Sequence, residues 1–116
     1  MEGSLLPITV AHGEGQVRYR NPVDSEEAYN TLRYVDGNGI ATETYPANPN
    51  GSLWGQTGFC TPDGRFNILM PHPERVWRRS QFSWAPNSWS QGALDDHRAE
   101  EGPWLRMFRN ARRWVG

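Results

Sequence analysis

The sequence predicts a small α/β domain in which short strands precede a C-terminal helix. Three observations support this fold class. Apolar and alternating runs near the beginning of the chain have the length of strands rather than of helices. A proline–glycine turn between two further apolar runs indicates a β-hairpin at residues 57–70. In the last stretch, residues 103–115, apolar side chains recur at helical spacing.

Length and composition are those of one loop-rich globular domain. The chain has 116 residues, of which 36% are hydrophobic, 12 are glycine and 9 are proline. A formal net charge of −1 gives no electrostatic reason to expect nucleic acid or an anionic membrane as a partner. No apolar run approaches the roughly 20 residues that span a bilayer, and no basic-then-apolar leader follows Met1, so we expect a cytoplasmic protein.

The first predicted elements are two strands and one helical turn. Residues 5–10 form a short apolar run that is typical of a buried strand. Residues 16–20 alternate, so Val17 and Tyr19 share one face of a second strand. The polar segment that follows can hold one helical turn at residues 25–28.

The middle of the chain continues with a strand, a turn and a loop. Residues 32–35 predict a third strand, which ends at the strong turn signal of residues 36–39, Asp-Gly-Asn-Gly. Residues 42–45 can return beside that strand. Residues 46–52 show no periodicity and are rich in proline, asparagine and glycine, so they predict an ordered loop.

The hairpin is the clearest supersecondary element. Residues 61–64 fit a type I turn because proline occupies the second position and glycine the fourth. The turn joins residues 57–60 to residues 66–70, and the second of these strands leads directly into His72. Residues 1–75 therefore form a strand-rich half that carries the residues with the clearest catalytic pattern.

An aromatic loop region and a helix complete the chain. Residues 76–102 are irregular and rich in tryptophan, whereas residues 103–115 begin with Pro103, which suits the first position of a helix. Arginines near the end of this helix complement its dipole, and we favour a solvated role for them over phosphate binding. The predicted apolar face of the helix consists of Trp104, Phe108, Ala111 and Val115.

The run Met70-Pro71-His72-Pro73-Glu74-Arg75 has the pattern of a catalytic dyad. Proline keeps the residue before it out of the helical region, so His72 is expected to be extended. In an extended segment residues i and i+2 point to the same side, which brings the His72 imidazole and the Glu74 carboxylate together. In this arrangement an acid orients a basic histidine for proton transfer, but it lacks a nucleophile.

The sequence offers no convincing nucleophile for this dyad. Cys60 is the only cysteine, which excludes an internal disulfide and a cysteine-cluster metal site. It lies next to the hairpin turn, whereas His72 lies beyond the opposite end, roughly 17 Å away at ~3.3 Å per residue. A nucleophile and its base need about 2.6–3.2 Å. No Gly-x-Ser-x-Gly elbow accompanies the serines of the aromatic region, Ser80, Ser83, Ser88 and Ser90.

A metal site is the alternative use of these residue types. His12 and Glu14 repeat the His-x-Glu spacing of His72 and Glu74, and two histidines with two carboxylates can in principle hold a divalent ion. Such pairs arise easily, so for His12 we favour a hydrogen-bonded histidine at a strand end. His97 lies in an acidic stretch and is expected to be solvated.

An ordered set of motifs resembles a known family. Together the motifs are similar to the C-terminal end of the large, fused form of phosphoribosylformylglycinamidine synthase, whose last domain is a class I (triad) glutamine amidotransferase. The resemblance covers nearly the whole chain. In chain order its motifs are Ala11-His12-Gly13-Glu14-Gly15, Leu32-Arg33-Tyr34-Val35-Asp36, Tyr45-Pro46-Ala47-Asn48-Pro49-Asn50-Gly51-Ser52, Asp63-Gly64-Arg65, Met70-Pro71-His72-Pro73-Glu74-Arg75 and Gly102-Pro103-Trp104-Leu105-Arg106-Met107-Phe108-Arg109-Asn110-Ala111-Arg112.

This resemblance implies a fold and a reaction. The fold would be the C-terminal half of the family's three-layer sandwich, so residues 1–116 would be a partial glutamine amidotransferase domain and a fragment of a longer ligase. In the family a cysteine attacks the glutamine amide, and the ammonia released serves purine biosynthesis by amidinating formylglycinamide ribonucleotide at an ATP-dependent site. The resemblance assigns His72 as the general base and Glu74 as its orienting carboxylate.

The same resemblance sets the expected cofactors and partners. The nucleophilic cysteine of the family lies in a Gly-x-Cys elbow that this sequence lacks, so the isolated chain is expected to be inactive. ATP and magnesium would act in the absent synthetase domains, and we expect no cofactor or metal in this chain. Glutamine and the remainder of the enzyme are the implied partners. The alternatives are an inert residual interaction module and part of a stand-alone glutaminase subunit.

Overall fold

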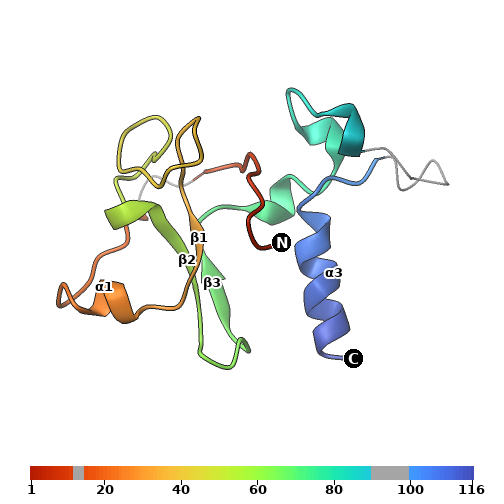
Figure 1. The fold of residues 1–116 in the computed structure, drawn as a ribbon. Coiled ribbons are helices and arrows are strands. Elements are labelled where there is room, and N and C mark those ends of the chain that lie inside the picture. Colours follow the sequence, from red (N-terminus) through yellow and green to blue (C-terminus); the bar gives the residue numbers. More distant parts are fainter. Residues whose placement is uncertain (12–14, 90–99) are drawn as a thin grey trace. The chain divides into compact units, whose positions relative to one another are not determined.

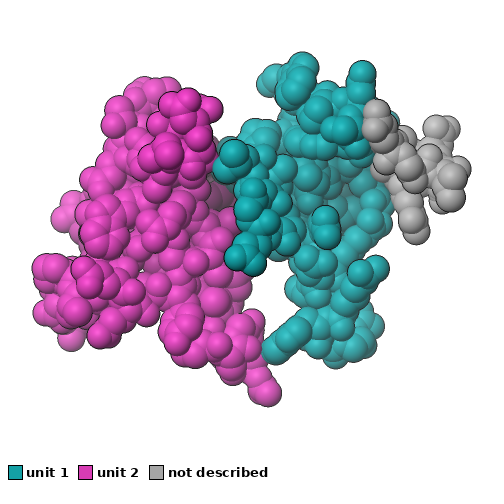
Figure 2. All heavy atoms as spheres, viewed as in Figure 1, with its two compact units in different colours: residues 1–9, 72–116 teal, residues 10–71 magenta. Residues whose placement is uncertain are grey.

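The chain falls into two compact units (Figure 2). The structure, a computed structural model, describes residues 1–11, 15–89 and 100–116. Unit 1 comprises Met1–Thr9 and His72–Gly116, and unit 2 comprises Val10–Pro71. The predictions made for His12, Glu14, Ser90 and His97 lie outside the described residues.

The α/β fold class predicted from the sequence is confirmed (Figure 1). Unit 2 contains a three-stranded sheet of order β1-β2-β3, and unit 1 ends in a helix. In the part of the chain that the structure describes, every helix is too short or too polar to cross a bilayer. The regular elements, in chain order, are α1 (Asp24–Glu27), β1 (Asn30–Arg33), β2 (Gln56–Cys60), β3 (Asn67–Leu69) and α3 (Leu105–Trp114).

The predicted hairpin is present in unit 2. β2 pairs with β3 in antiparallel register, with Gly58 opposite Leu69 and Cys60 opposite Asn67. The turn between them closes where the Gly64 N–H donates to the Thr61 carbonyl at 2.9 Å. The proline–glycine turn at residues 61–64 therefore sets the register of β2 and β3, as the sequence pattern predicted.

The strands predicted at residues 5–10 and 16–20 are wrong. Neither segment forms a ladder, and Leu5 is 66% exposed. Residues 16–20 do keep alternating burial, with Val17 and Tyr19 partly buried between exposed neighbours. The Val17 N–H, however, donates to the Ser52 side chain at 3.1 Å instead of to a strand. Alternating burial indicates an extended backbone, but a β-strand also needs a neighbouring strand with which its backbone groups can form hydrogen bonds.

The predictions for the helical turn and for the following strand were close. The helical turn expected at residues 25–28 is α1. The third strand, β1, begins two residues earlier than predicted and pairs antiparallel with β2. The return segment predicted at residues 42–45 forms no strand; the residue before it, Ala41, forms a single bridge with Val35. In the turn between them the Asp36 carboxylate accepts hydrogen bonds from two backbone N–H groups, at 2.8 and 3.0 Å.

The loop at residues 46–52 is ordered because its polar groups form the interior of unit 2. Asn48 is 1% exposed and Ser52 is fully buried. Asn48 Nδ2 donates to the Thr42 and Ser52 carbonyls, both at 2.9 Å, and its Oδ1 accepts the Gly51 N–H at 2.9 Å. These bonds satisfy backbone groups that no strand pairs, so the loop can be buried without unpaired polar atoms.

We expect Asn48→Ala to destabilise the chain by about 2–4 kcal/mol, because it leaves buried carbonyl and N–H groups without partners. Urea unfolding would measure the change. Asn38→Ala is the matched control, since Asn38 is exposed and contributes only its backbone N–H to the Asp36 turn. The control should change the free energy of unfolding by no more than about 0.5 kcal/mol. Equal effects of the two substitutions would contradict the role given to Asn48.

Among the described residues of unit 1, the buried side chains of Val76 and Trp104 lie in irregular backbone. α3 confirms the predicted C-terminal helix, but the predicted apolar face does not form a core. Trp104 is 5% exposed, whereas Phe108 is 40% and Val115 is 69% exposed. Helical spacing shows which side chains share a face, and among the described residues nothing covers the far end of this one.

The aromatic region packs through short local contacts. Its backbone forms 3₁₀ turns at Arg79–Gln81 and Asn87–Trp89, and the Phe82 and Trp89 rings meet edge to face with centroids 5.2 Å apart. The Gly102 N–H donates to the Trp77 carbonyl at 2.6 Å, and a Cβ at Gly102 would lie 2.9 Å from that oxygen. A glycine is therefore needed at position 102, where the chain passes close to the Trp77 backbone before α3 begins.

Candidate functional site

His72 is held by its backbone in unit 1. Its backbone, with φ −111° and ψ 77°, lies outside the helical region, as its position before proline predicts, but its ψ is smaller than that of the extended conformation that we expected. Its N–H donates to the Thr9 carbonyl at 3.0 Å. The flanking prolines, Pro71 and Pro73, are both buried. The backbone on either side of the imidazole is therefore stiff and fixed to a second segment of the chain.

Glu74 reaches His72 by a different route from the one predicted. The sequence pattern suggests an extended backbone through residue 74, but Pro73 opens a 3₁₀ turn, Pro73–Arg75. Proline suits the first helical position because it has no N–H to satisfy and its φ is already helical. The Arg75 N–H then donates to the His72 carbonyl at 3.0 Å. The turn curls Glu74 back toward the imidazole.

The two side chains form a hydrogen-bonded pair. His72 Nδ1 lies 2.7 Å from Glu74 Oε1, and the side chains are 31% and 56% exposed, respectively. The hydrogen bond from His72, followed by a backbone hydrogen bond, lowers the pKa of the Glu74 carboxyl below its ordinary value of 4.5. An ionised carboxylate can only accept, so Nδ1 carries the proton and Nε2 is the basic nitrogen of the neutral ring.

The lowered pKa of Glu74 also sets the sign of its effect on stability. A carboxyl whose pKa is lower in the folded state stabilises that state at pH values above its ordinary pKa. This contribution is lost as the pH falls through the folded-state pKa. The stabilisation contributed by the Glu74 carboxylate is therefore fully present at neutral pH and is lost only in acid.

The structure does not bring a nucleophile to this pair within the described residues. Cys60 lies at the turn end of β2, opposite Asn67, and is half-buried. Its backbone N–H donates to the Tyr29 carbonyl at 2.9 Å. Three of the serines that the sequence analysis set aside are exposed and make no hydrogen bond to His72: Ser80, Ser83 and Ser88.

The metal hypothesis finds no support in the part of the chain that the structure describes. No group of three or more histidine, cysteine, aspartate or glutamate side chains gathers there in a way that could hold an ion. His12 and Glu14, on which the hypothesis depended, lie outside that part. His72 and Glu74 alone form a two-residue hydrogen-bonded pair.

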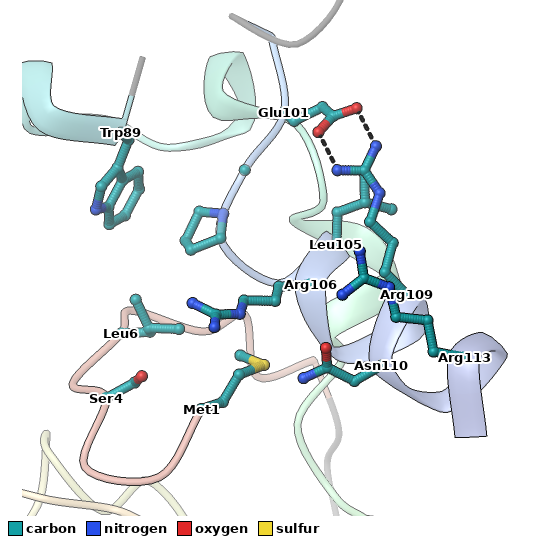
Figure 3. Close-up of a pocket in the computed structure, with 12 residues that line it drawn as sticks. Met1, Ser4, Leu6, Trp89, Glu101, Leu105, Arg106, Arg109, Asn110 and Arg113 are labelled. Atoms are coloured by element: carbon teal, nitrogen blue, oxygen red, sulfur yellow. Dashed lines mark hydrogen bonds and ion pairs between the residues drawn. The ribbon is translucent and has the colours of Figure 1, made fainter. Parts of the chain in front are cut away.

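A cavity of about 540 Å³ lies along α3 in unit 1 (Figure 3). Its lining includes Arg106, Arg109 and Arg113, but neither His72 nor Glu74. Glu101 bonds Arg109 with both carboxylate oxygens, at 2.6 and 2.5 Å. Such a bidentate pair neutralises one cation inside the cavity. The Arg109 side chain is 51% exposed, in keeping with the solvated role expected for the arginines of this helix, but its ion pair with Glu101 was not predicted.

A further feature that sequence reasoning missed is the environment of Trp104. The indole Nε1–H donates to the Pro7 carbonyl at 2.7 Å, across 97 positions of the sequence. An apolar side chain on a helical face signalled burial, but no local pattern signalled a hydrogen bond to the other end of unit 1.

Comparison with protein families supplies an independent observation. The model of the CobB/CobQ-like glutamine amidotransferase domain matches residues 1–115. This agrees with the general class implied by the ordered motifs, a glutamine amidotransferase domain, and with the α/β fold described above. Glutamine is the amide donor of such domains, and a domain of this class forms part of a glutamine-dependent enzyme. The chain belongs to the family of CobB/CobQ-like glutamine amidotransferase domains.

Proposed function

We propose that this chain supplies the general base and its orienting carboxylate to a glutaminase site. The observation that supports this proposal is the His72 Nδ1 to Glu74 Oε1 hydrogen bond of 2.7 Å. It leaves Nε2 as the proton acceptor, with an ionised carboxylate behind the ring to stabilise the imidazolium that forms. Both side chains are partly exposed, so a substrate and a nucleophile from another segment can reach them.

The proposed reaction uses a cysteine that this sequence does not supply in a suitable place. His72 Nε2 takes the thiol proton, and the thiolate attacks the side-chain amide carbon of glutamine. The imidazolium then gives its proton to the leaving nitrogen as the C–N bond breaks, which releases ammonia and leaves a thioester. Water, deprotonated by the same imidazole, cleaves the thioester to glutamate and regenerates the thiol.

We further propose that the parent enzyme is phosphoribosylformylglycinamidine synthase, a cytoplasmic ligase of purine biosynthesis. The ordered motifs support this assignment, above all the Met70-Pro71-His72-Pro73-Glu74-Arg75 run and the residues from Gly102 to Arg112. Ammonia from the glutaminase site would amidinate formylglycinamide ribonucleotide at a separate ATP- and magnesium-dependent site. The resemblance implies that ATP and magnesium act in the synthetase domains of that enzyme and not in this chain.

We expect the isolated chain to release no ammonia from glutamine above the buffer rate, because a general base without a nucleophile provides no acyl-enzyme route. A coupled glutamate dehydrogenase assay on the purified chain would measure this. Cys60→Ser serves as the control for the one thiol present. Hydrolysis that is measurable and disappears in Cys60→Ser would identify Cys60 as the nucleophile and overturn the proposal of an external cysteine.

A second candidate function is a non-catalytic interaction module. The observation that favours it is the exposure of tryptophan in the aromatic region, where Trp84 is 76% exposed. A module of this kind would bind its partner equally well with or without His72. A Gly-x-Cys elbow encoded upstream in the same reading frame would favour the glutaminase, and the length of polypeptide carrying it would separate the fused enzyme from a stand-alone glutaminase subunit.

A further inference from the structure

Residues 7–9 of unit 1 connect the catalytic pair to a tryptophan far along the chain. At one end of this segment the Pro7 carbonyl accepts a hydrogen bond from Trp104 Nε1 at 2.7 Å. At the other end the Thr9 carbonyl accepts the His72 N–H at 3.0 Å. Trp104 is 5% exposed, so its indole N–H is fixed inside unit 1.

We propose that Trp104 is a positioning residue for His72, acting through the Pro7–Thr9 segment. Its importance for catalysis rests on the glutaminase function proposed above, but its effect on His72 can be measured without any reaction. The indole is a donor only, and a buried donor needs an acceptor. The Pro7 carbonyl is this acceptor. The hydrogen bond fixes the position of Pro7 and therefore the position of the Thr9 carbonyl, which accepts the His72 N–H.

The segment is short and stiff enough to transmit this constraint. Two peptide bonds follow the Pro7 carbonyl before the Thr9 carbonyl, and both peptide units are planar. Proline restricts its own φ to about −65°, which limits how the chain approaches the Pro7 carbonyl. Between the two carbonyl groups only the φ and ψ of Ile8 and Thr9 can rotate, so we expect a displacement of Pro7 to shift Thr9, and with it the acceptor of the His72 N–H.

Trp104 is itself well anchored at the beginning of α3. The Gly102 N–H donates to the Trp77 carbonyl at 2.6 Å, and the Leu105 N–H donates to the Gly102 carbonyl at 3.2 Å. Residue 104 follows this glycine and immediately precedes the helix. The indole is thus held at its backbone by the aromatic region and at its Nε1 by Pro7.

The experiment replaces the tryptophan by 3-benzothienylalanine, which keeps the bicyclic ring but has sulfur in place of the N–H. Position 104 is compared with position 114, the last residue of α3, where the tryptophan is 62% exposed. Two quantities are measured by NMR on the chain: amide hydrogen exchange at His72 and Gly102, and the ¹⁵N shifts of the His72 imidazole, which report the Nδ1–H bond to Glu74.

We expect the change at position 104 to speed exchange of the His72 amide about tenfold, and the change at position 114 to leave it unaltered. The Gly102 amide should keep its rate in both variants, because its acceptor is the Trp77 carbonyl. The imidazole ¹⁵N shifts should move only in the position 104 variant, as the Nδ1–H bond to Glu74 becomes less uniform.

Three outcomes would overturn the proposal. They are unchanged exchange at His72, an equal rise at His72 and Gly102, and loss of folding in the position 104 variant, because the last two indicate a role in stability alone. A failure of the glutaminase assignment would look different. In that case the exchange and ¹⁵N results stand, while substitution of His72 leaves glutamine-dependent activity intact.

Discussion

Replacing His72 by alanine in the complete enzyme should lower the glutamine-dependent rate by a factor on the order of 10⁶, the loss that follows removal of the general base from comparable triads. The rate with added ammonium salts should stay within a few-fold of wild type. In the proposed mechanism His72 acts only on formation and breakdown of the thioester, whereas the ATP-dependent site of the proposed parent enzyme would use ammonia from either source. Parallel assays of product formation with glutamine and with ammonium chloride would measure both rates.

The ammonium-dependent rate is the internal control for folding in this experiment. A variant that misfolds loses both activities, while one that lacks only the proton acceptor loses one. Equal decreases in the two rates would show that His72 is structural, and the central assignment made above would be wrong.

The second large effect is expected for Glu74→Gln, which should lower the glutamine-dependent rate by a factor on the order of 10⁴. The amide is close in size to the carboxylate but removes the charge that stabilises the imidazolium. It can also present an N–H₂ group to Nδ1, which favours the tautomer with its proton on Nε2. The effect is smaller than that of His72→Ala because the base itself is retained. Single-turnover release of glutamate would isolate the affected step.

The matched control for Glu74→Gln is Asp63→Asn. Asp63 is another exposed carboxylate, and a hydrogen bond from Thr61 is the main cause that lowers its pKa. It lies in the hairpin turn of unit 2. Asp63→Asn should leave both rates within a few-fold of wild type. In the wild-type enzyme Glu74 should remain ionised above its ordinary pKa of 4.5, so its titration should not limit the rate near neutral pH. A loss in Asp63→Asn as large as in Glu74→Gln would argue against a specific role for Glu74.

The features predicted correctly from the sequence are those determined by residues that are adjacent in the chain. The β2–β3 hairpin follows from the proline and glycine of its turn, and the non-helical backbone at His72 follows from Pro73. The approach of Glu74 to the imidazole was also expected. Its mechanism was not, because the same proline that keeps His72 out of the helical region also opens the turn that carries Glu74.

The features that were missed depend on partners distant in the sequence. The apolar run at residues 5–10 has the sequence pattern of a strand. In the structure, however, the Pro7 carbonyl accepts a hydrogen bond from Trp104 and the Thr9 carbonyl accepts one from His72. The interior of unit 2 is polar around Asn48, whereas sequence patterns locate cores by their apolar residues. Long-range hydrogen bonds of this kind leave no periodicity in the sequence.

The separation of Trp104 from Pro7 has a consequence for the order of events during protein synthesis. The His72–Glu74 pair is local, so it can form as soon as residue 75 has left the ribosome. The indole bond must wait until residue 104 has also left the ribosome, 29 positions after residue 75. At about 5–20 residues per second that delay is roughly 1.5–6 s. A nascent chain therefore contains the His72–Glu74 pair before Trp104 can bond to Pro7, and the proposed positioning of His72 depends on synthesis of the chain through α3.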